Sequence, residues 1–179
     1  MMKNWIYPAA AAIIVAASAF TLVEQRSWTI EDGYEIKFTS DDPTGVFTAM
    51  AGDIVFDEND LENSYFKVKV DVSSINTGNG MQNKHAVSEN WFDAEKYPHI
   101  GFASRDIEKT DKGFVAHGTL SIHGVEKEMD LPFKFEGASG KGVFKSKFQV
   151  NRTDFNLGDP GNKASHVLQM EVTVPVSGK

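Results

Sequence analysis

Five histidines are the side chains of this chain that could bind a metal ion or transfer protons. His117 and His123 share one face of an expected strand, but six residues of extended chain place them about 20 Å apart, too far to bind one ion. His85, His99 and His166 fall in or beside connections, without a ligand spacing such as H-x-x-x-H. The sequence therefore predicts no metal site.

The sequence also lacks the signatures of nucleophilic catalysis and of a calcium loop. It contains no cysteine and no G-x-S-x-G turn, which excludes a thiol nucleophile and a serine elbow. The acidic stretch that begins at Asp57 is only faintly similar to a calcium loop, because Glu62 stands where such a loop needs glycine. We expect a protein that is not an enzyme and that uses no cofactor.

The elements that must position any site are β-strands. Between Met129 and Phe135, apolar residues alternate with charged ones, so a strand here would have one apolar face and one solvent-exposed face. The same alternation predicts eight strands, at about 28–40, 44–57, 65–75, 98–109, 113–123, 126–137, 142–151 and 166–176. Turn sequences separate most of them, so neighbouring strands should be antiparallel. The fold class is all-β, and the sheet must close or stack to cover its apolar faces.

Two connections are long enough to carry structure or function of their own. In residues 76–98, Asn79 is placed to cap a short helix, an insertion between strands 3 and 4. Met81, Trp91 and Phe92 could cover one mouth of a barrel as a lid, or form a plug that only seals the core. In residues 151–165, Arg152 and Asp154 form a pair that most often ties down a loop, with a ligand headgroup contact as the alternative.

The interior of an eight-stranded barrel can be filled by side chains or can hold one small ligand. The residues expected to line it face inward by strand parity: Phe38, Phe56, Phe66, Val70, Phe102, Phe114, Ala116, Leu120, Phe133, Phe135, Phe148 and Met170. The phenylalanines could fill the tube, whereas Ala116 and Gly118 leave room, so the residues alone leave both possibilities open. A height of roughly 23 Å, from about nine residues per tilted strand, exceeds the ~15 Å of one bilayer leaflet.

The N-terminal segment has the layout of a secretory signal peptide. Lys3 is followed by an apolar run over residues 9–17 and by the small-x-small sequence Ala17-Ser18-Ala19. We predict a signal peptide over residues 1–19 and one domain over residues 20–179, periplasmic or secreted, with no stable membrane span after cleavage. The alternative is an uncleaved anchor over residues 6–23, which is barely long enough to span a bilayer.

Composition agrees with a single exported domain. A chain of 179 residues with 41% hydrophobic content can build one core without disulfides. A net charge of −7 without a basic stripe argues against binding to nucleic acid.

Several blocks resemble, in their order and spacing, those of the YceI-like family. They are Lys84-His85-Ala86, the run from Ser88 to Pro98, the run from Gly118 to Lys127, and Asn151-Arg152-Thr153-Asp154-Phe155. The resemblance implies a lipocalin-like antiparallel barrel, usually periplasmic, that binds a polyisoprenoid chain inside and performs no chemistry on it. Asn83, Val87 and Glu126 depart from residues common in the family, which leaves the headgroup preference open.

These observations lead to two functional hypotheses. The first, implied by the resemblance, is non-catalytic binding, carriage or storage of a long-chain isoprenoid lipid of polyprenyl or isoprenoid quinone type, by a monomer or weak dimer. The alternative is a barrel with a packed core and a stress-related or scaffolding role, without a lipid ligand.

Overall fold

The computed structural model describes residues 26–179, so the predicted signal peptide lies outside the described residues. This part of the chain forms one antiparallel sheet of eleven strands, two 3₁₀ turns and one α-helix. The strands are β1 (Ser27–Ile30), β2 (Glu35–Thr39), β3 (Gly45–Phe47), β4 (Met50–Val55), β5 (Tyr65–Asp71), β6 (Ile75–Asn76), β7 (His99–Thr110), β8 (Gly113–Ile122), β9 (Val125–Ala138), β10 (Lys141–Asn151) and β11 (Val167–Gly178), and the helix is α1 (Gly80–Ala86). The 3₁₀ turns cover Val72–Ser74 and Arg152–Phe155.

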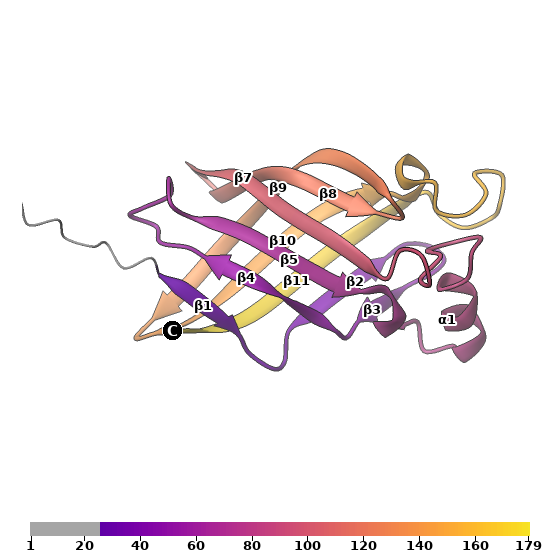
Figure 1. The fold of residues 1–179 in the computed structure, drawn as a ribbon, viewed down its shortest axis with the longest axis horizontal. Helices are drawn as coiled ribbons and strands as arrows, with labels where there is room; N and C mark the ends of the chain where they lie inside the picture. Colours follow the sequence, from indigo (N-terminus) through magenta and orange to yellow (C-terminus); the bar gives the residue numbers. More distant parts are fainter. Residues whose placement is uncertain (1–25) are drawn as a thin grey trace, which may run out of the picture.

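The sheet closes into an eight-stranded barrel, as the sequence predicts (Figure 1). We call each of its eight positions a stave, whether one strand or two consecutive strands occupy it. Each of the first three expected strands is broken in two, giving the pairs β1 and β2, β3 and β4, and β5 and β6. The first break contains Gly33, whose φ of 88° suits glycine. The third is the turn Val72–Ser74, which Asp71 caps by accepting a hydrogen bond from the backbone N–H of Ser73.

Strand β1 closes the ring because it pairs on both sides. Trp28 lies opposite Gly178 of β11, and Ser27 lies opposite Val55 of β4. The order around the barrel continues from β4 through β5 and β7–β11, and β11 also pairs with β2. The described part of the sheet therefore has its first and last strands side by side.

The alternation of side chains in the sequence reappears as alternation of burial. In β8, every second residue from Phe114 to Ile122 is buried, and those between are only half-buried. A bulge at Arg105 shifts the register between β7 and β8. Gly118 lies opposite this bulge, where a Cβ atom would overlap the carbonyl oxygen of Ala103. Glycine here permits the close approach of two backbones and does not widen the interior.

Helix α1 and the long loop before β11 lie at one end of the barrel, on the right in Figure 1. Asn79 caps the helix as expected, accepting hydrogen bonds from the backbone N–H groups of Met81 and Gln82. None of the helix residues is buried, so α1 is a surface element over the barrel end. Within residues 26–179 there is no helix of the length and apolar character needed to cross a membrane.

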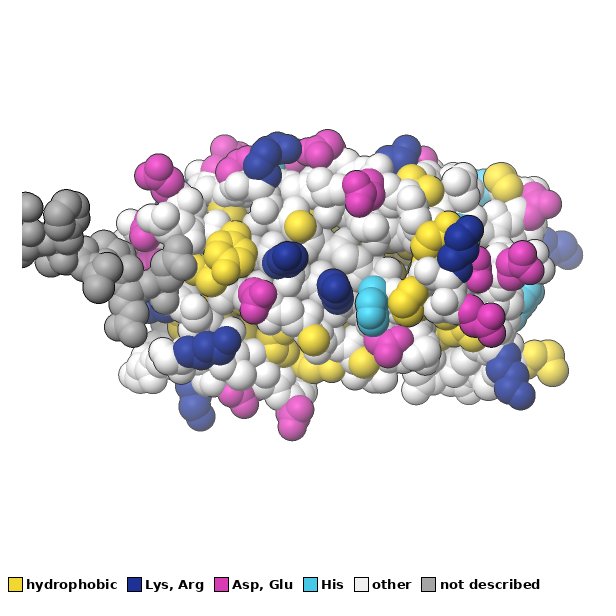
Figure 2. All heavy atoms as spheres, viewed as in Figure 1, with side chains coloured by type: hydrophobic (Ala, Val, Ile, Leu, Met, Phe, Trp, Pro, Cys, Tyr) yellow, Lys and Arg dark blue, Asp and Glu magenta, His cyan; other side chains and the backbone are white. Residues whose placement is uncertain are grey.

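The outer surface carries charges of both signs, scattered over the face shown in Figure 2. Cross-strand ion pairs join Arg105 to Glu128 (2.8 Å) and Lys147 to Glu171 (2.8 Å). Their side chains are largely exposed, so each pair contributes little to stability. The outer face of the barrel is therefore polar, and the apolar side chains of the strands point to the interior.

Candidate functional site

A cavity of about 350 Å³ occupies the half of the barrel next to α1. A volume of this size is at the lower end of the range for small-molecule sites. Its wall is mostly apolar and combines inward residues of the strands with residues of the two long connections: Ile36, Phe38, Phe47, Met50, Val68, Val70, Ile75, Ala86, Trp91, Phe92, Ile100, Phe102, Leu120, Ile122, Leu131, Phe148, Val150, Leu157, Leu168, Met170 and Val172. Asp42, Gln82 and His85 also border it and are exposed, so the cavity reaches solvent at this end.

The wall of the cavity includes six of the residues expected to line the barrel. They are Phe38, Val70, Phe102, Leu120, Phe148 and Met170. On each strand these positions lie toward the α1 end. In β11, for example, Leu168, Met170 and Val172 border the cavity, whereas Val174 and Val176 further along the strand are buried beyond it.

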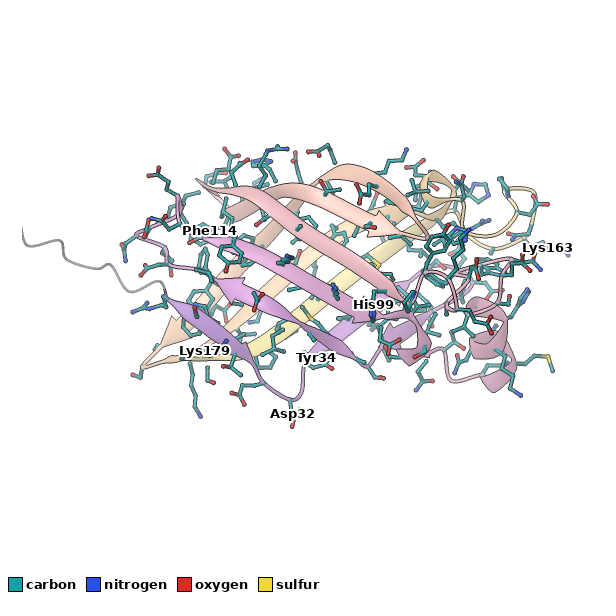
Figure 3. All side chains as sticks on the ribbon, viewed as in Figure 1. Asp32, Tyr34, His99, Phe114, Lys163 and Lys179 are labelled. Atoms are coloured by element: carbon teal, nitrogen blue, oxygen red, sulfur yellow. The ribbon has the colours of Figure 1, made fainter. Side chains whose placement is uncertain are left out.

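The other end of the barrel is filled by aromatic rings. We call the six residues Phe56, Phe66, Phe114, Phe133, Phe135 and Phe144 the aromatic plug. Phe56 is fully buried at its centre, with its ring centroid 5.1 to 6.3 Å from the other five. Trp28 adds an edge contact to Phe135 (5.1 Å) and donates a hydrogen bond from Nε1 to the carbonyl oxygen of Phe56 (2.8 Å). Figure 3 shows Phe114 at the end of the barrel opposite Lys163.

The remaining expected lining residues do not border this cavity. The residues that lie in the filled end instead are Phe56, Phe114, Ala116 and Phe135. The sequence could not show this, because strand parity gives the face of a residue but not its depth along the barrel. Phe66 and Phe133 border a second, smaller cavity of about 80 Å³. The two cavities share wall residues, including Met50, Val68 and Phe102, so the smaller one continues the larger one toward the plug.

The expected lid residues separate into two groups. Trp91 and Phe92 border the cavity, and the ring of Phe92 also meets that of Phe47 edge-on at 6.0 Å. Met81 does not border the cavity and is 81% exposed, because it lies on the solvent side of the first turn of α1. The helix instead contributes Gln82, His85 and Ala86 to the wall.

Trp91 joins the two long connections over the cavity. The Arg152 guanidinium lies 5.3 Å from the centre of its ring, and the His85 ring meets it edge-on at 5.9 Å. A Cβ atom on Gly158 would lie 3.1 Å from the indole, so glycine lets the loop before β11 pack closely against the ring. Trp91 thus connects α1, its following turns and the loop at residues 156–166.

Arg152 is buried and holds that loop in place. Its N–H groups donate to the carbonyl oxygens of Leu157 (2.6 Å) and Ser165 (3.0 Å) and to Oδ1 of Asn162 (2.7 Å). Further donor contacts reach the carbonyl oxygens of Asp159 and Ala164. Burial lowers the pKa of Arg152, while the nearby charge of Asp159 opposes this effect. The loop-anchoring role is therefore as expected, but the acceptors are loop carbonyls and Asn162, and Asp154 is exposed.

The rim of the cavity is polar. Thr77, Gln82, His85 and Ser165 supply hydrogen-bonding groups, and Asp42 supplies a carboxyl group. Asn83, one of the departures from the family pattern, accepts hydrogen bonds from the backbone and hydroxyl of Thr77 (2.9 and 2.8 Å). Asn83 thereby holds the segment that enters α1. This role was not expected from the sequence, although the N-cap signal at Asn79 places Asn83 in the first turns of the helix.

Few of the side chains around the cavity are ionisable. Among the described wall residues, the groups that could titrate are Asp42, His85 and Arg152, and the donors of Arg152 are used by the loop. In residues 26–179, no three His, Asp or Glu side chains are grouped so as to hold a metal ion.

Comparisons with known proteins agree with this architecture. The model of the YceI-like domain matches residues 20–178. A UPF0312 protein of Photorhabdus laumondii is 28% identical over 137 residues, which cover 71% of each chain. A UPF0312 protein of Vibrio parahaemolyticus is also 28% identical over 137 residues, 73% of this chain and 71% of that protein.

Three solved structures share the fold. The Campylobacter jejuni YceI protein superposes with a TM-score of 0.70 at 25% identity, covering 79% of this chain and 87% of that one. Burkholderia cenocepacia BcnA gives a TM-score of 0.72 at 21% identity, covering 79% and 95%. A polyisoprenoid binding domain from Saccharophagus degradans gives 0.67 at 14% identity, covering 85% and 98%.

Proposed function

The chain belongs to the YceI-like family, and from this we propose that it binds a long-chain isoprenoid lipid, of polyprenyl or isoprenoid quinone type, for carriage or storage. The lipid tail would occupy the cavity beside α1, and the protein would perform no chemistry on it. Trp91 and Phe92 would cover the tail as a lid.

The observation that carries this proposal is the apolar cavity, whose exposed wall residues Asp42, Gln82 and His85 let it reach solvent at the α1 end of the barrel. Each methylene moved from water into such a wall gains about 0.8 kcal/mol, less the cost of ordering the tail. Affinity then comes mainly from the tail. A barrel whose core is packed throughout would leave no cavity of this volume, so the alternative scaffolding role has less support.

The choice of an isoprenoid over a straight acyl chain is supported by two comparisons. The family assignment covers nearly all of the described chain, and a neighbour of the same fold is named for polyisoprenoid binding. The wall itself is rich in branched and aromatic side chains, which suit a methyl-branched tail.

We also propose export and a monomeric or weakly dimeric state. The signal-like layout of residues 1–19 supports export, and the family match begins at residue 20, where the mature chain would start. Charged side chains on the outer strands support a protein without a large permanent interface.

Mass spectrometry of an organic extract from natively purified protein tests the function. We expect an isoprenoid lipid in an amount approaching one per protein molecule. A matched Val70→Trp variant, which places an indole in the cavity, should yield much less of the same lipid while keeping its circular dichroism spectrum. The absence of lipid from the wild-type extract, together with no binding of a fluorescent polyprenyl probe, would contradict the proposal.

A further inference from the structure

We propose that the aromatic plug sets the maximum length of the lipid tail that the barrel accepts. This inference rests on the proposed function and adds a specificity to it. The rings would act as a stop against which the end of the tail abuts.

The first step is that the aromatic plug closes the far end of the tunnel. Phe56 is fully buried among the other plug rings, and Phe114 stacks on Phe133 with centroids 5.3 Å apart. The Phe66 ring meets that of Phe133 at 5.0 Å. Rings in contact at these distances leave no passage for a chain, so a tail that enters beside α1 cannot leave through the far end.

The second step is the depth of the tunnel. Along β11, the wall of the two cavities runs from Leu168 to Val174. At about 3.3 Å per residue and a strand tilt of ~40°, this span corresponds to roughly 15 Å along the barrel axis. The plug thus shortens the usable interior to about the hydrocarbon thickness of one bilayer leaflet. A longer tail must fold back inside or keep its remaining units in water beyond Asp42 and His85.

The third step identifies the rings that form the stop. Phe66, Phe133 and Phe144 border the 80 Å³ cavity, which is the inner end of the tunnel. Phe114 is also buried and in contact with Phe133, but it borders neither cavity. Truncation of Phe133 should therefore deepen the tunnel, whereas truncation of Phe114 should not.

The experiment uses a series of all-trans prenols that increase by one isoprene unit, competing with a fluorescent polyprenyl probe. For the wild type we expect affinity to rise with each unit up to a break and then to stop rising. In Phe133→Ala the break should move to a longer prenol, which binds the variant on the order of tenfold more tightly than the wild type. Phe114→Ala is the matched control, with lowered melting temperature and an unmoved break.

Phe66→Leu provides a milder variant in case Phe133→Ala does not fold, and it should shift the break in the same direction. A wild-type affinity that keeps rising through the longest prenols would overturn the length limit, as would an unmoved break in a folded plug variant. Both of those results leave prenol binding intact and so leave the proposed function standing. Failure of every prenol to bind the wild type would instead remove the proposed function and the length limit together.

Discussion

Single residues show that depth in the barrel, and not only the direction of a side chain, decides what a substitution does. Ala116 and Val70 both face inward, but Ala116 is fully buried in the filled end and Val70 borders the cavity. We expect Ala116→Trp to overpack the core and to lower the free energy of unfolding by about 1–3 kcal/mol or more. Val70→Trp should keep most of its stability and lose binding of a polyprenyl probe. Urea unfolding and probe titration of both variants measure the contrast.

A reversed pattern, with Ala116→Trp as stable as the wild type and Val70→Trp unfolded, would contradict the assignment of a filled and a hollow end.

His117 on the outer face provides a pH-dependent contribution to stability. Its Nδ1–H donates to Oδ1 of Asp130 (2.6 Å), and Nε2 lies 3.4 Å from Glu108. The hydrogen bond to Asp130 raises the pKa of His117 above its ordinary value near 6.5, and Glu108 and Asp106 act in the same direction. Because the folded-state pKa is raised, the stabilisation is fully present below about pH 6.5 and is lost as the pH rises through the folded pKa.

Replacing Asp130 by Asn should therefore lower the melting temperature more at pH 5.5 than at pH 9. Thermal unfolding of both proteins across this range measures the difference, with Glu171→Gln as a control that pairs with Lys147 and not with a histidine. A difference that is constant with pH, or larger at pH 9, would show that the pair does not ionise as described.

At the scale of elements, the ring of Trp91 lies between the two long connections, over the cavity. Trp91 is half-buried and contacts Arg152, His85 and Gly158. We expect Trp91→Ala to speed the release of a bound probe because it separates α1 from the loop before β11. Its loss of stability should stay below the ~3–5 kcal/mol of a fully buried Trp truncation. Stopped-flow displacement and thermal unfolding give the two quantities.

Met81→Ala is the matched control for Trp91→Ala, because Met81 belongs to the same connection, residues 76–98, and its side chain is 81% exposed. It should change neither release nor stability. Unchanged release in Trp91→Ala would remove Trp91 from the lid.

The strands were predictable because apolar and polar residues alternate along most of them, as in β8 and β11. The breaks at Gly33 and at Val72–Ser74 were not, since short turns within a stave preserve the apolar face on both sides. The division of the interior into cavity and plug was also beyond the pattern. Alternation is the same for Phe114 and Leu120, and only the register between strands places one in the plug and the other in the cavity wall.

The connections show a similar limit. The capping signal at Asn79 correctly predicted a helix start, but a helix of seven residues is too short for spacing alone to tell the face of Met81 from that of Gln82. The loop-anchoring role of Arg152 could be expected from its type and place, whereas its carbonyl acceptors depend on the folded path of residues 157–165.

At the scale of the whole molecule, we expect export with removal of residues 1–19. Lys3, the apolar run and Ala17-Ser18-Ala19 predict cleavage after Ala19. N-terminal sequencing of protein recovered outside the cytoplasm should begin at Phe20. Replacing Ala19 by a bulky residue such as Leu should leave the segment attached. Recovery of the full-length wild type in the membrane fraction would favour the anchor instead.

The pairing of β1 with β11 also determines when the molecule can finish folding. Trp28 can pair with Gly178 only after almost all of the intervening strands have been synthesised. Trp28 also contacts the ring of Phe135 and donates a hydrogen bond to the carbonyl oxygen of Phe56 in the aromatic plug. Contacts between residues so far apart in sequence are slow to form because the loop entropy is lost before they are gained. The barrel can therefore close only after β11 has been synthesised, and until then Trp28 lacks its partner on that strand.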